Sequence, residues 1–426
     1  RELTAENIFA IQSEMAFAIA DALQATLSPA EVSLIEKVPT QNTLAYDFYL
    51  SGLDYFNRTE YEFAAQQFQR AVDSDPNLSL GWAMLSRSYS HTYWGSQQIV
   101  EQYRFQALEA VEKALMLDPE LPEAHLAMGH YYYHGLRDYQ QALEELAIAR
   151  ADMPGQIDAI EMQAFVNRRM GNWEEAADLA NLVFELNPRA ATTLSDLSLI
   201  FTWLKDYDKA NIFLDKAIEI LPDFGINYGR KAKNLLAQTG GLEAGFQVLA
   251  SAPDDVGYLS AFTEFYIKSR NFEQAINYIE NSQNIGLGLP VEINLVMKTV
   301  IKAYVHGIAG NSELAASLYN EAKPAFEQII ETIPNSSFLL SMYGVALAGI
   351  NEKDAALDIA QQALRLMPES IDILERKNIQ NLVTIGIFIP IGEYELAIDT
   401  LDNYLATPGG DPIESILLQP TIDHIR

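Results

Sequence analysis

Cysteine is absent from the 426-residue chain. Its absence excludes disulfide bonds, thiolate zinc sites and cysteine nucleophiles, and it suits an oxidising compartment without requiring one. Long apolar runs are missing as well. The longest, LVTIGIFIPIG at 382–392, is too short to cross a bilayer and contains Pro390. We therefore expect no membrane insertion by this chain.

Positive charge is scarce. Lysine and arginine total 28 against 58 acidic residues, so the formal net charge is −30. A field of this sign repels nucleic acid and anionic lipid, and we expect no nucleic-acid binding by this chain. With 49% hydrophobic residues, the chain is nevertheless expected to fold into a packed protein.

The motifs of common catalytic sites are also missing. The sequence contains no G-x4-G-K-[ST], G-x-G-x2-G, G-x-S-x-G or H-E-x2-H pattern. We therefore expect the chain not to be an enzyme and to need no cofactor and no metal.

A repeated spacing is present instead. In FAAQQFQRAVDSDPNLSLGWAMLSRSY, residues 63–89, four residues follow the pattern A-x3-F-x2-A-x4-P, and W-x2-L-x3-Y comes next. The first alanine of this unit occurs ten times along the chain, Ala64 included. The interval is 34 residues between the alanines at 142, 176, 210 and 244, and about 40 nearer the C-terminus. These first alanines are Ala64, Ala107, Ala142, Ala176, Ala210, Ala244, Ala275, Ala315, Ala356 and Ala397.

The spacing predicts two antiparallel helices in each unit. A small side chain, such as the alanines or Gly52 and Gly129, lets a neighbouring helix approach closely. The proline that ends a unit stops the second helix because it has no N–H to donate. One helix pair cannot bury its own apolar stripe, so the pairs must stack on one another in a one-dimensional array.

This frame resembles the tetratricopeptide repeat over residues 45–408. The resemblance implies an all-α, right-handed superhelical solenoid of about ten antiparallel helix pairs. We expect regular units one to six at 45–253 and longer, degenerate units seven to ten at 254–408. Ser251 stands at the second alanine position of unit six, and about nine extra residues, HTYWGSQQI and neighbours, are expected between the two helices of the second unit.

The flanking segments carry a second resemblance. RELTAENIFAIQSEMAFAIADAL and VPTQNTLAYDFYLSGLDYFN look like the junction between a TolB-like (FlgO-type) domain and its trailing repeats. The tail ILLQPTIDHIR, within residues 409–426, is similar to the ending of such arrays. In that family the array follows an adenylate cyclase domain or a winged-helix transcription regulator, so residues 1–44 are expected to link to a missing upstream domain.

One amphipathic helix is predicted over residues 4–28, with Thr4 as its N-cap. Its apolar side chains are Ile8, Phe9, Ile11, Met15, Ile19 and Leu23. We expect it to cap the first repeat, because the end of a stacked array needs such a cover. The alternative is a helix used for dimerisation or for contact with another domain.

Candidate binding residues follow from the resemblance. In this family the first helix of each unit lines a concave groove, and the ligand-facing places are 2, 5, 9, 12 and 13 of the unit. The positions that match are Tyr46, Tyr49, Asn57, Arg87, His91, His130, Tyr133, His134, Arg168, Arg169, Trp203 and Lys233. Any one of them is also explained as a packing or solvated residue.

The cations among these residues predict the partner. Arg87, Arg168, Arg169 and Lys233 would form a local positive strip that attracts a carboxylate-bearing segment. The dicarboxylate-clamp lysine and asparagine of the family are replaced by Tyr49 and Leu53, so binding of a chaperone C-terminus is not implied.

Three histidines support a rival class of function. His130 and His134 are four apart on a predicted helix, and His91 holds the equivalent place one unit earlier. Three imidazoles could converge as they do around zinc. Histidines at this spacing are common on wet helix faces, so a metal-dependent enzyme is the weaker hypothesis.

Together these observations predict a protein–protein interaction module that binds a peptide or protein segment. We expect it to be the sensory or scaffolding part of a larger bacterial signalling or regulatory protein, cytoplasmic or periplasmic. The alternative is a structural or dimerisation module, a possible homodimer, that positions an upstream catalytic or DNA-binding domain.

Overall fold

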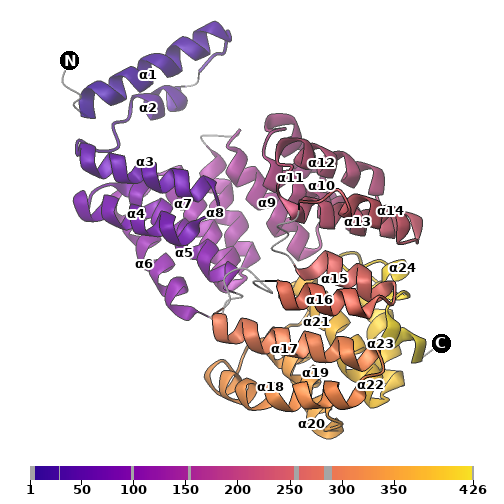
Figure 1. Cartoon of the computed structure of the whole chain (residues 1–426). Coiled ribbons are helices and arrows are strands. Elements are labelled where there is room, and N and C mark those ends of the chain that lie inside the picture. Colours follow the sequence, from indigo (N-terminus) through magenta and orange to yellow (C-terminus); the bar gives the residue numbers. More distant parts are fainter. Residues whose placement is uncertain are drawn as a thin grey trace. The chain divides into compact units, whose positions relative to one another are not determined.

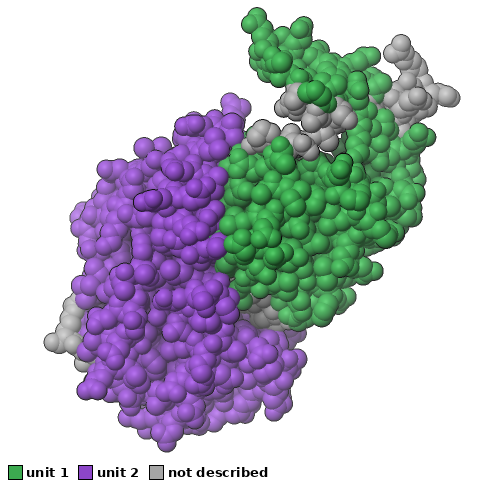
Figure 2. Space-filling model, turned by 180° about the vertical axis from the view of Figure 1, so that it is seen from behind, with its two compact units in different colours: residues 1–166 green, residues 167–426 purple. Residues whose placement is uncertain are grey.

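The computed structural model describes residues 5–27, 29–96, 100–151, 155–253, 259–282 and 290–424. Within these ranges the regular structure is helical, with short π and 3₁₀ segments and no strand (Figure 1). None of the described helices has both the length and the hydropathy needed to span a bilayer. The chain forms two compact units, residues 1–166 and residues 167–426, which are coloured separately in Figure 2.

Unit 1 begins with α1 (Ala5–Ala22) and α2 (Pro29–Glu36) and continues with helix pairs whose members contact each other. The helix α7 runs directly into a π-helical turn, η1 (Tyr131–Leu136). The pairs are α3 (Thr43–Asn57) with α4 (Tyr61–Ser74), α5 (Ser79–Gly95) with α6 (Glu101–Leu117), and α7 (Pro122–His130) with α8 (Tyr139–Ala151).

The boundary between the units falls inside α9 (Ile157–Met170), which is followed by α10 (Trp173–Leu186). Six further pairs follow, and the last of them contains a second π-helical turn, η2 (Thr384–Phe388), and α22 (Ile389–Ile391). They are α11 (Ala191–Trp203) with α12 (Tyr207–Ile220), α13 (Gly225–Thr239) with α14 (Glu243–Leu249), α15 (Leu259–Lys268) with α16 (Phe272–Asn281), α17 (Val291–Ile308) with α18 (Ser312–Thr332), α19 (Ser337–Gly349) with α20 (Lys353–Leu366), and α21 (Ile373–Val383) with α23 (Tyr394–Leu405). The described residues thus contain the ten predicted helix pairs, and the all-α repeat fold is confirmed.

The repeated alanines are contact points. Nine of the ten first alanines are at most 4% exposed, as close helix packing requires. The exception is Ala244, which is only partly buried, while its neighbour Gly245 is buried. A Cβ on Gly245 would lie 2.2 Å from the ring of Phe265, so the glycine takes the contact position there. The contact position predicted for the sixth repeat was therefore wrong by one residue.

The prolines end the second helices as predicted. The helices α4, α6, α10, α12, α18 and α20 each stop two residues before a proline. The residue between leaves the helical conformation, as Asp75 (φ −138°, ψ 95°) and Asp118 (φ −148°, ψ 90°) show, because a proline disfavours that conformation in its predecessor. Pro154, predicted to end another unit, lies outside the described residues.

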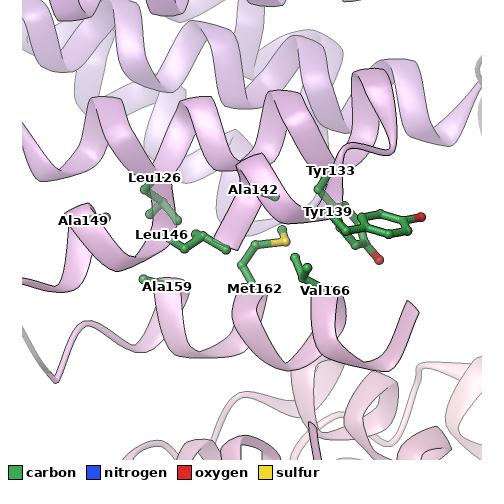
Figure 3. Packing of buried hydrophobic residues seen from close by; sticks show 9 residues of the cluster. All are labelled: Leu126, Tyr133, Tyr139, Ala142, Leu146, Ala149, Ala159, Met162 and Val166. Carbon is green, nitrogen blue, oxygen red and sulfur yellow. The ribbon is translucent and has the colours of Figure 1, made fainter. Parts of the chain in front are cut away.

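The third helix pair shows how the core is built (Figure 3). Leu126 of α7 and Leu146 of α8 pack together with Met162 and Val166 of α9, and Ala142 and Ala149 leave room for them. A Cβ on Gly129 would lie 3.0 Å from the side chain of Leu146, which confirms the close approach predicted there.

Two N-terminal predictions need correction. The single helix expected at 4–28 ends at Ala22 as α1, a second helix, α2, begins only at Pro29, and Thr4 lies outside the described residues. Met15, Ile19 and Leu23 are 59%, 56% and 74% exposed, and the capping role of this segment stays a prediction. In the second helix pair, His91–Gly95 extend α5 instead of forming a loop between the two helices. Residues 97–99 are not described.

Candidate functional site

The first helices of successive pairs lie next to one another. In unit 1, α5 contacts α7 and η1, and in unit 2, α11 contacts α13, α13 contacts α15, and α17 contacts α19. We call the surface formed by these helices the first-helix face of each unit. The predicted binding residues all come from first helices or from the turn η1.

In unit 1 this face carries a cluster of three imidazoles. The ring centroid of His91 is 5.0 Å from that of His130 and 4.9 Å from that of His134, and the last two are 5.5 Å apart. The π-helical turn η1 places His134 in this cluster. The three rings, whose meeting the sequence left open, therefore lie together in the structure.

Aromatic rings surround the imidazoles. Tyr61 stacks on His91 at 4.4 Å with an interplanar angle of 11°, and the ring of Phe56 meets His91 edge-on. The Arg87 guanidinium lies 5.0 Å from the centre of the Phe56 ring and forms an ion pair with Asp158 at 2.9 Å. The cluster is thus held by ring contacts and bordered by one compensated cation.

Burial keeps the imidazoles of His91 and His130 neutral. It lowers the pKa of His91 to about 3, with a further contribution from Arg87, and it lowers the pKa of His130 well below its ordinary value. No described residue makes a hydrogen bond to either ring nitrogen of His130, which is 4% exposed. In the described ranges, no group of three His, Asp or Glu side chains is arranged to hold a metal ion. The cluster therefore gives no support to the metal-enzyme hypothesis.

The lowered pKa values predict acid sensitivity. A histidine with a folded-state pKa below the unfolded value of about 6.5 contributes no penalty above pH 6.5, and it destabilises the fold as the pH falls toward 3. At pH 5 one such imidazole lowers the free energy of unfolding by about 2 kcal/mol. We expect His91→Phe, which keeps the ring stacking, to reduce the stability difference between pH 7 and pH 5 by about this amount.

Urea denaturation at the two pH values measures this difference. Tyr61→Phe is the matched control, because it keeps the stack and removes no group that titrates in this range. If His91→Phe retains the pH dependence of the unmodified chain, His91 is protonated in the folded state and our account of the cluster is wrong.

The remaining predicted residues of unit 1 differ in exposure. Tyr46 and Tyr49 stack on each other at 6.0 Å, with Tyr46 buried, and Asn57 is exposed. Tyr133 is 3% exposed and belongs to the hydrophobic cluster of Figure 3, where it packs beside Tyr139. The packing explanation thus holds for Tyr46 and Tyr133.

The predicted binding cations of unit 2 all make contacts within that unit. Arg168 donates to the backbone oxygen of Asp196 at 3.0 Å, and its guanidinium lies 5.5 Å from the centre of the Trp203 ring. Arg169 pairs with Asp372 at 2.7 Å. Lys233 pairs with Glu264.

Arg87 in unit 1 and Arg169 and Lys233 in unit 2 thus pair with carboxylates, which reduces the positive charge that these residues were expected to present. Position in a repeat indicates which face a side chain is on, but it does not reveal a carboxylate brought there by a distant helix. Charge reversal at Arg168 or Lys233 would disturb internal contacts and is therefore a poor test of binding.

Glu264 lies between two lysines. Burial alone would raise its pKa, but the ammonium groups of Lys233 and Lys268 outweigh this effect and lower the pKa to about 2. The Lys268 side chain is 0% exposed, and it also donates a hydrogen bond to Ser415. This buried lysine therefore connects α15 to the end of the chain.

The C-terminal segment, residues 409–424, lies on the first-helix face of unit 2. It contains a short helix, α24 (Ile413–Ile416), which contacts α13, and a 3₁₀ turn, η3 (Pro420–His424). Its inward side chains are almost fully buried, with Ser415 at 5%, Ile416 at 4% and Ile422 at 3% exposure.

Polar contacts fasten this segment to three first helices and the residues that follow them. Arg270, just after α15, donates to the backbone oxygen of Leu418 and pairs with Asp423 at 2.8 Å. The hydroxyl groups of Tyr304 and Thr421 are 2.7 Å apart, and Asn381 donates to Asp411 at 3.3 Å.

The sequence analysis missed these contacts. Apart from the contact of Asn381 with Asp411, they join residues 117 to 153 positions apart, and Lys268 and Arg270 stand in the degenerate repeats, where no binding positions were assigned. The one signal available was a pair of cations, Lys268 and Arg270, at the end of a first helix in a strongly acidic chain.

Comparisons with known proteins concern the repeats. No family model matches the chain. Anaphase-promoting complex subunit 3 of Schizosaccharomyces pombe is 21% identical over 262 residues, which is 55% of this chain and 39% of that protein. The chain thus spans less than half the length of this curated relative.

Two solved structures are also similar. A thermophilic TPR protein of Thermus thermophilus is 19% identical, with a TM-score of 0.39, over 45% of this chain and 99% of that one. The human IFIT1 dimer with m7Gppp-AAAA is 14% identical, with a TM-score of 0.44, over 85% of this chain and 77% of that one. The helix pairs, their contact alanines and the prolines that end their second helices give the described residues an all-α, TPR-like repeat fold.

Proposed function

We propose that the chain binds a protein segment on the first-helix face of its helix pairs, as the sensory or scaffolding part of a larger bacterial signalling or regulatory protein. One observation carries this proposal: in unit 2 that face already holds a chain segment, residues 409–424, through buried side chains and polar contacts. A face complementary to one segment in the same chain is suited to a similar segment of a partner.

The C-terminal segment also indicates the chemistry of the partner. It places Ile416 and Ile422 inward and presents the carboxylate of Asp423 to Arg270. It carries three acidic residues, Asp411, Glu414 and Asp423, and no lysine or arginine before Arg426. We therefore expect a partner segment that combines apolar and acidic side chains, and affinity that falls as salt screens the charges.

A labelled peptide of residues 410–424 tests the proposal in the full-length chain. Leu418→Asp with Ile422→Asp should release the chain's own segment and leave the face open. This variant should bind the peptide at least about tenfold more tightly than the unmodified chain, because a tethered segment competes at a millimolar effective concentration. Fluorescence anisotropy measures both affinities.

Ile413→Asp is the matched control, because Ile413 belongs to the same segment and is 42% exposed. It should leave peptide binding as weak as in the unmodified chain. If the released variant does not bind the peptide, the face does not recognise segments and the proposal fails.

A second candidate function is dimerisation or positioning of an upstream TolB-like, catalytic or DNA-binding domain. The specific observation in its favour is the apolar stripe of α1, where Ile11, Met15 and Ile19 are 47%, 59% and 56% exposed. Side chains four apart lie on one side of a helix, and such a stripe is suited to another helix. Sedimentation equilibrium of the chain would reveal a dimer.

A further inference from the structure

A cavity lies within unit 2, beside the C-terminal segment. Its volume is about 360 Å³, and it is lined by residues of α15, α17, α19, α21 and η2, together with Asp411 and Gln419. Small-molecule sites in proteins range from about 300 to 1,000 Å³. The cavity is thus large enough for a compact molecule, and it is separate from the contacts that hold the C-terminal segment to α13.

The walls of the cavity are mainly apolar. Ile267, Val300, Met342 and Val345 line it and are each at most 8% exposed. A Cβ on Gly386 of η2 would lie 2.6 Å from Cγ2 of Val345, so this glycine lets the π-helical turn come close to α19. Turns of this kind inside α-helices are frequent at functional sites.

Two buried polar atoms in the lining lack partners. No described residue makes a hydrogen bond to Oγ1 of Thr263, which is 5% exposed, or to Oδ1 of Asn381. The amide nitrogen of Asn381 donates to Asp411 at 3.3 Å, which leaves its carbonyl oxygen as a spare acceptor. Buried polar groups are rarely left without a partner, so each of these atoms indicates a missing one.

The charges of the lining limit the class of ligand. Lys233 and Lys268 both pair with Glu264, and the carboxylate of Asp411, which also acts on Lys233, balances the second ammonium group. A charged ligand would therefore bring an uncompensated charge into a mainly apolar cavity, which is unfavourable. A neutral ligand with an N–H donor would satisfy the acceptor and fill the apolar space.

We propose that this cavity binds a small neutral molecule with an apolar body and an N–H group that donates to Oδ1 of Asn381. The body contacts Val300 and Met342, and Thr263 provides a hydroxyl group at the same cavity. This proposal does not require a partner segment, although Asp411 and Gln419 of the chain's own C-terminal segment form part of the cavity lining.

N-Phenyl-1-naphthylamine is a suitable probe for the full-length chain, since it is neutral, apolar and fluorescent and has one N–H group. Its affinity is compared with that of 1-benzylnaphthalene, in which a methylene group replaces N–H, by displacement. The amine should bind at least about tenfold more tightly than the hydrocarbon. The sulfonated analogue 1-anilinonaphthalene-8-sulfonate should bind at least about tenfold more weakly than the neutral amine.

Two variants locate the site. Asn381→Leu removes the acceptor and should abolish the preference for the amine over the hydrocarbon, with hydrocarbon affinity unchanged. Val300→Phe fills the cavity and should abolish binding of both, while circular dichroism verifies folding. Equal affinities for amine and hydrocarbon in the unmodified chain, or amine binding that survives Val300→Phe, would overturn the proposal. Failure of the unmodified chain to bind the amine would also overturn it.

Discussion

Glu264→Gln should destabilise unit 2 by about 3–5 kcal/mol, because it removes the carboxylate that compensates a buried lysine. The side chain of Lys268 is 0% exposed, and among the described residues its ammonium group donates to Glu264 and Ser415. The glutamine has nearly the same shape, so the loss reflects charge and not packing. Urea denaturation followed by circular dichroism measures the change.

A double variant isolates the cause. Glu264→Gln combined with Lys268→Met removes both charges and should recover most of the lost stability, since the penalty comes from the unpaired charge. The exposed pair of Lys323 and Glu352, joined at 2.7 Å, provides a control. Glu352→Gln should cost at most about 1 kcal/mol. If Glu264→Gln costs no more than this control, Lys268 is solvated and its role in holding the C-terminal segment is wrong.

Asp372→Ala should cost a similar amount, about 3–5 kcal/mol, because one buried carboxylate has two functions. Its side chain, 0% exposed, accepts from the backbone N–H groups of Leu374 and Glu375 at 3.0 Å and so caps the start of α21. It also pairs with Arg169, which is 203 residues away and only 12% exposed. The substitution leaves the arginine charge buried and removes the cap.

Asp372→Asn separates the two functions, because the amide oxygen still caps the helix but carries no charge. Asp372→Asn should therefore be more stable than Asp372→Ala by the contribution of the helix cap, about 1 kcal/mol. Asp206 is the matched control, since it caps α12 through the N–H of Lys209 and is exposed. Asp206→Ala should cost only about 1 kcal/mol. Equal losses for Asp206→Ala and Asp372→Ala would show that the pairing with Arg169 contributes nothing.

The repeat spacing predicted the fold because it reflects contacts that every unit makes. The buried alanines at 176 and 210 and the helix ends before Pro188 and Pro222 follow from local packing and backbone chemistry. The error at Ala244 is of the same kind, because Gly245 next to it is smaller still and takes the contact. Patterns of small residues locate a contact to within about one position.

The candidate site was predicted less well. The convergence of His91, His130 and His134 followed from equivalent places in neighbouring units, which the repeat itself aligns. The ion pair of Arg169 with Asp372 and the contact of Lys268 with Ser415 join segments more than a hundred residues apart, and no repeat relates them. Residue spacing alone therefore could not predict which partner each cation contacts.

The central claim is that the first-helix face of unit 2 holds a chain segment. Amide hydrogen exchange of residues 412–424 in the intact chain tests this claim most directly. The backbone N–H groups of Ile416, Leu417 and Ile422 are hydrogen-bonded within the segment, and Ile416 and Ile422 are buried against unit 2. We predict exchange at least about a hundredfold slower than in an unstructured chain, with protection lost in Leu418→Asp with Ile422→Asp. Exchange at the unstructured rate in the unmodified chain would contradict the claim, because the face would then hold no segment.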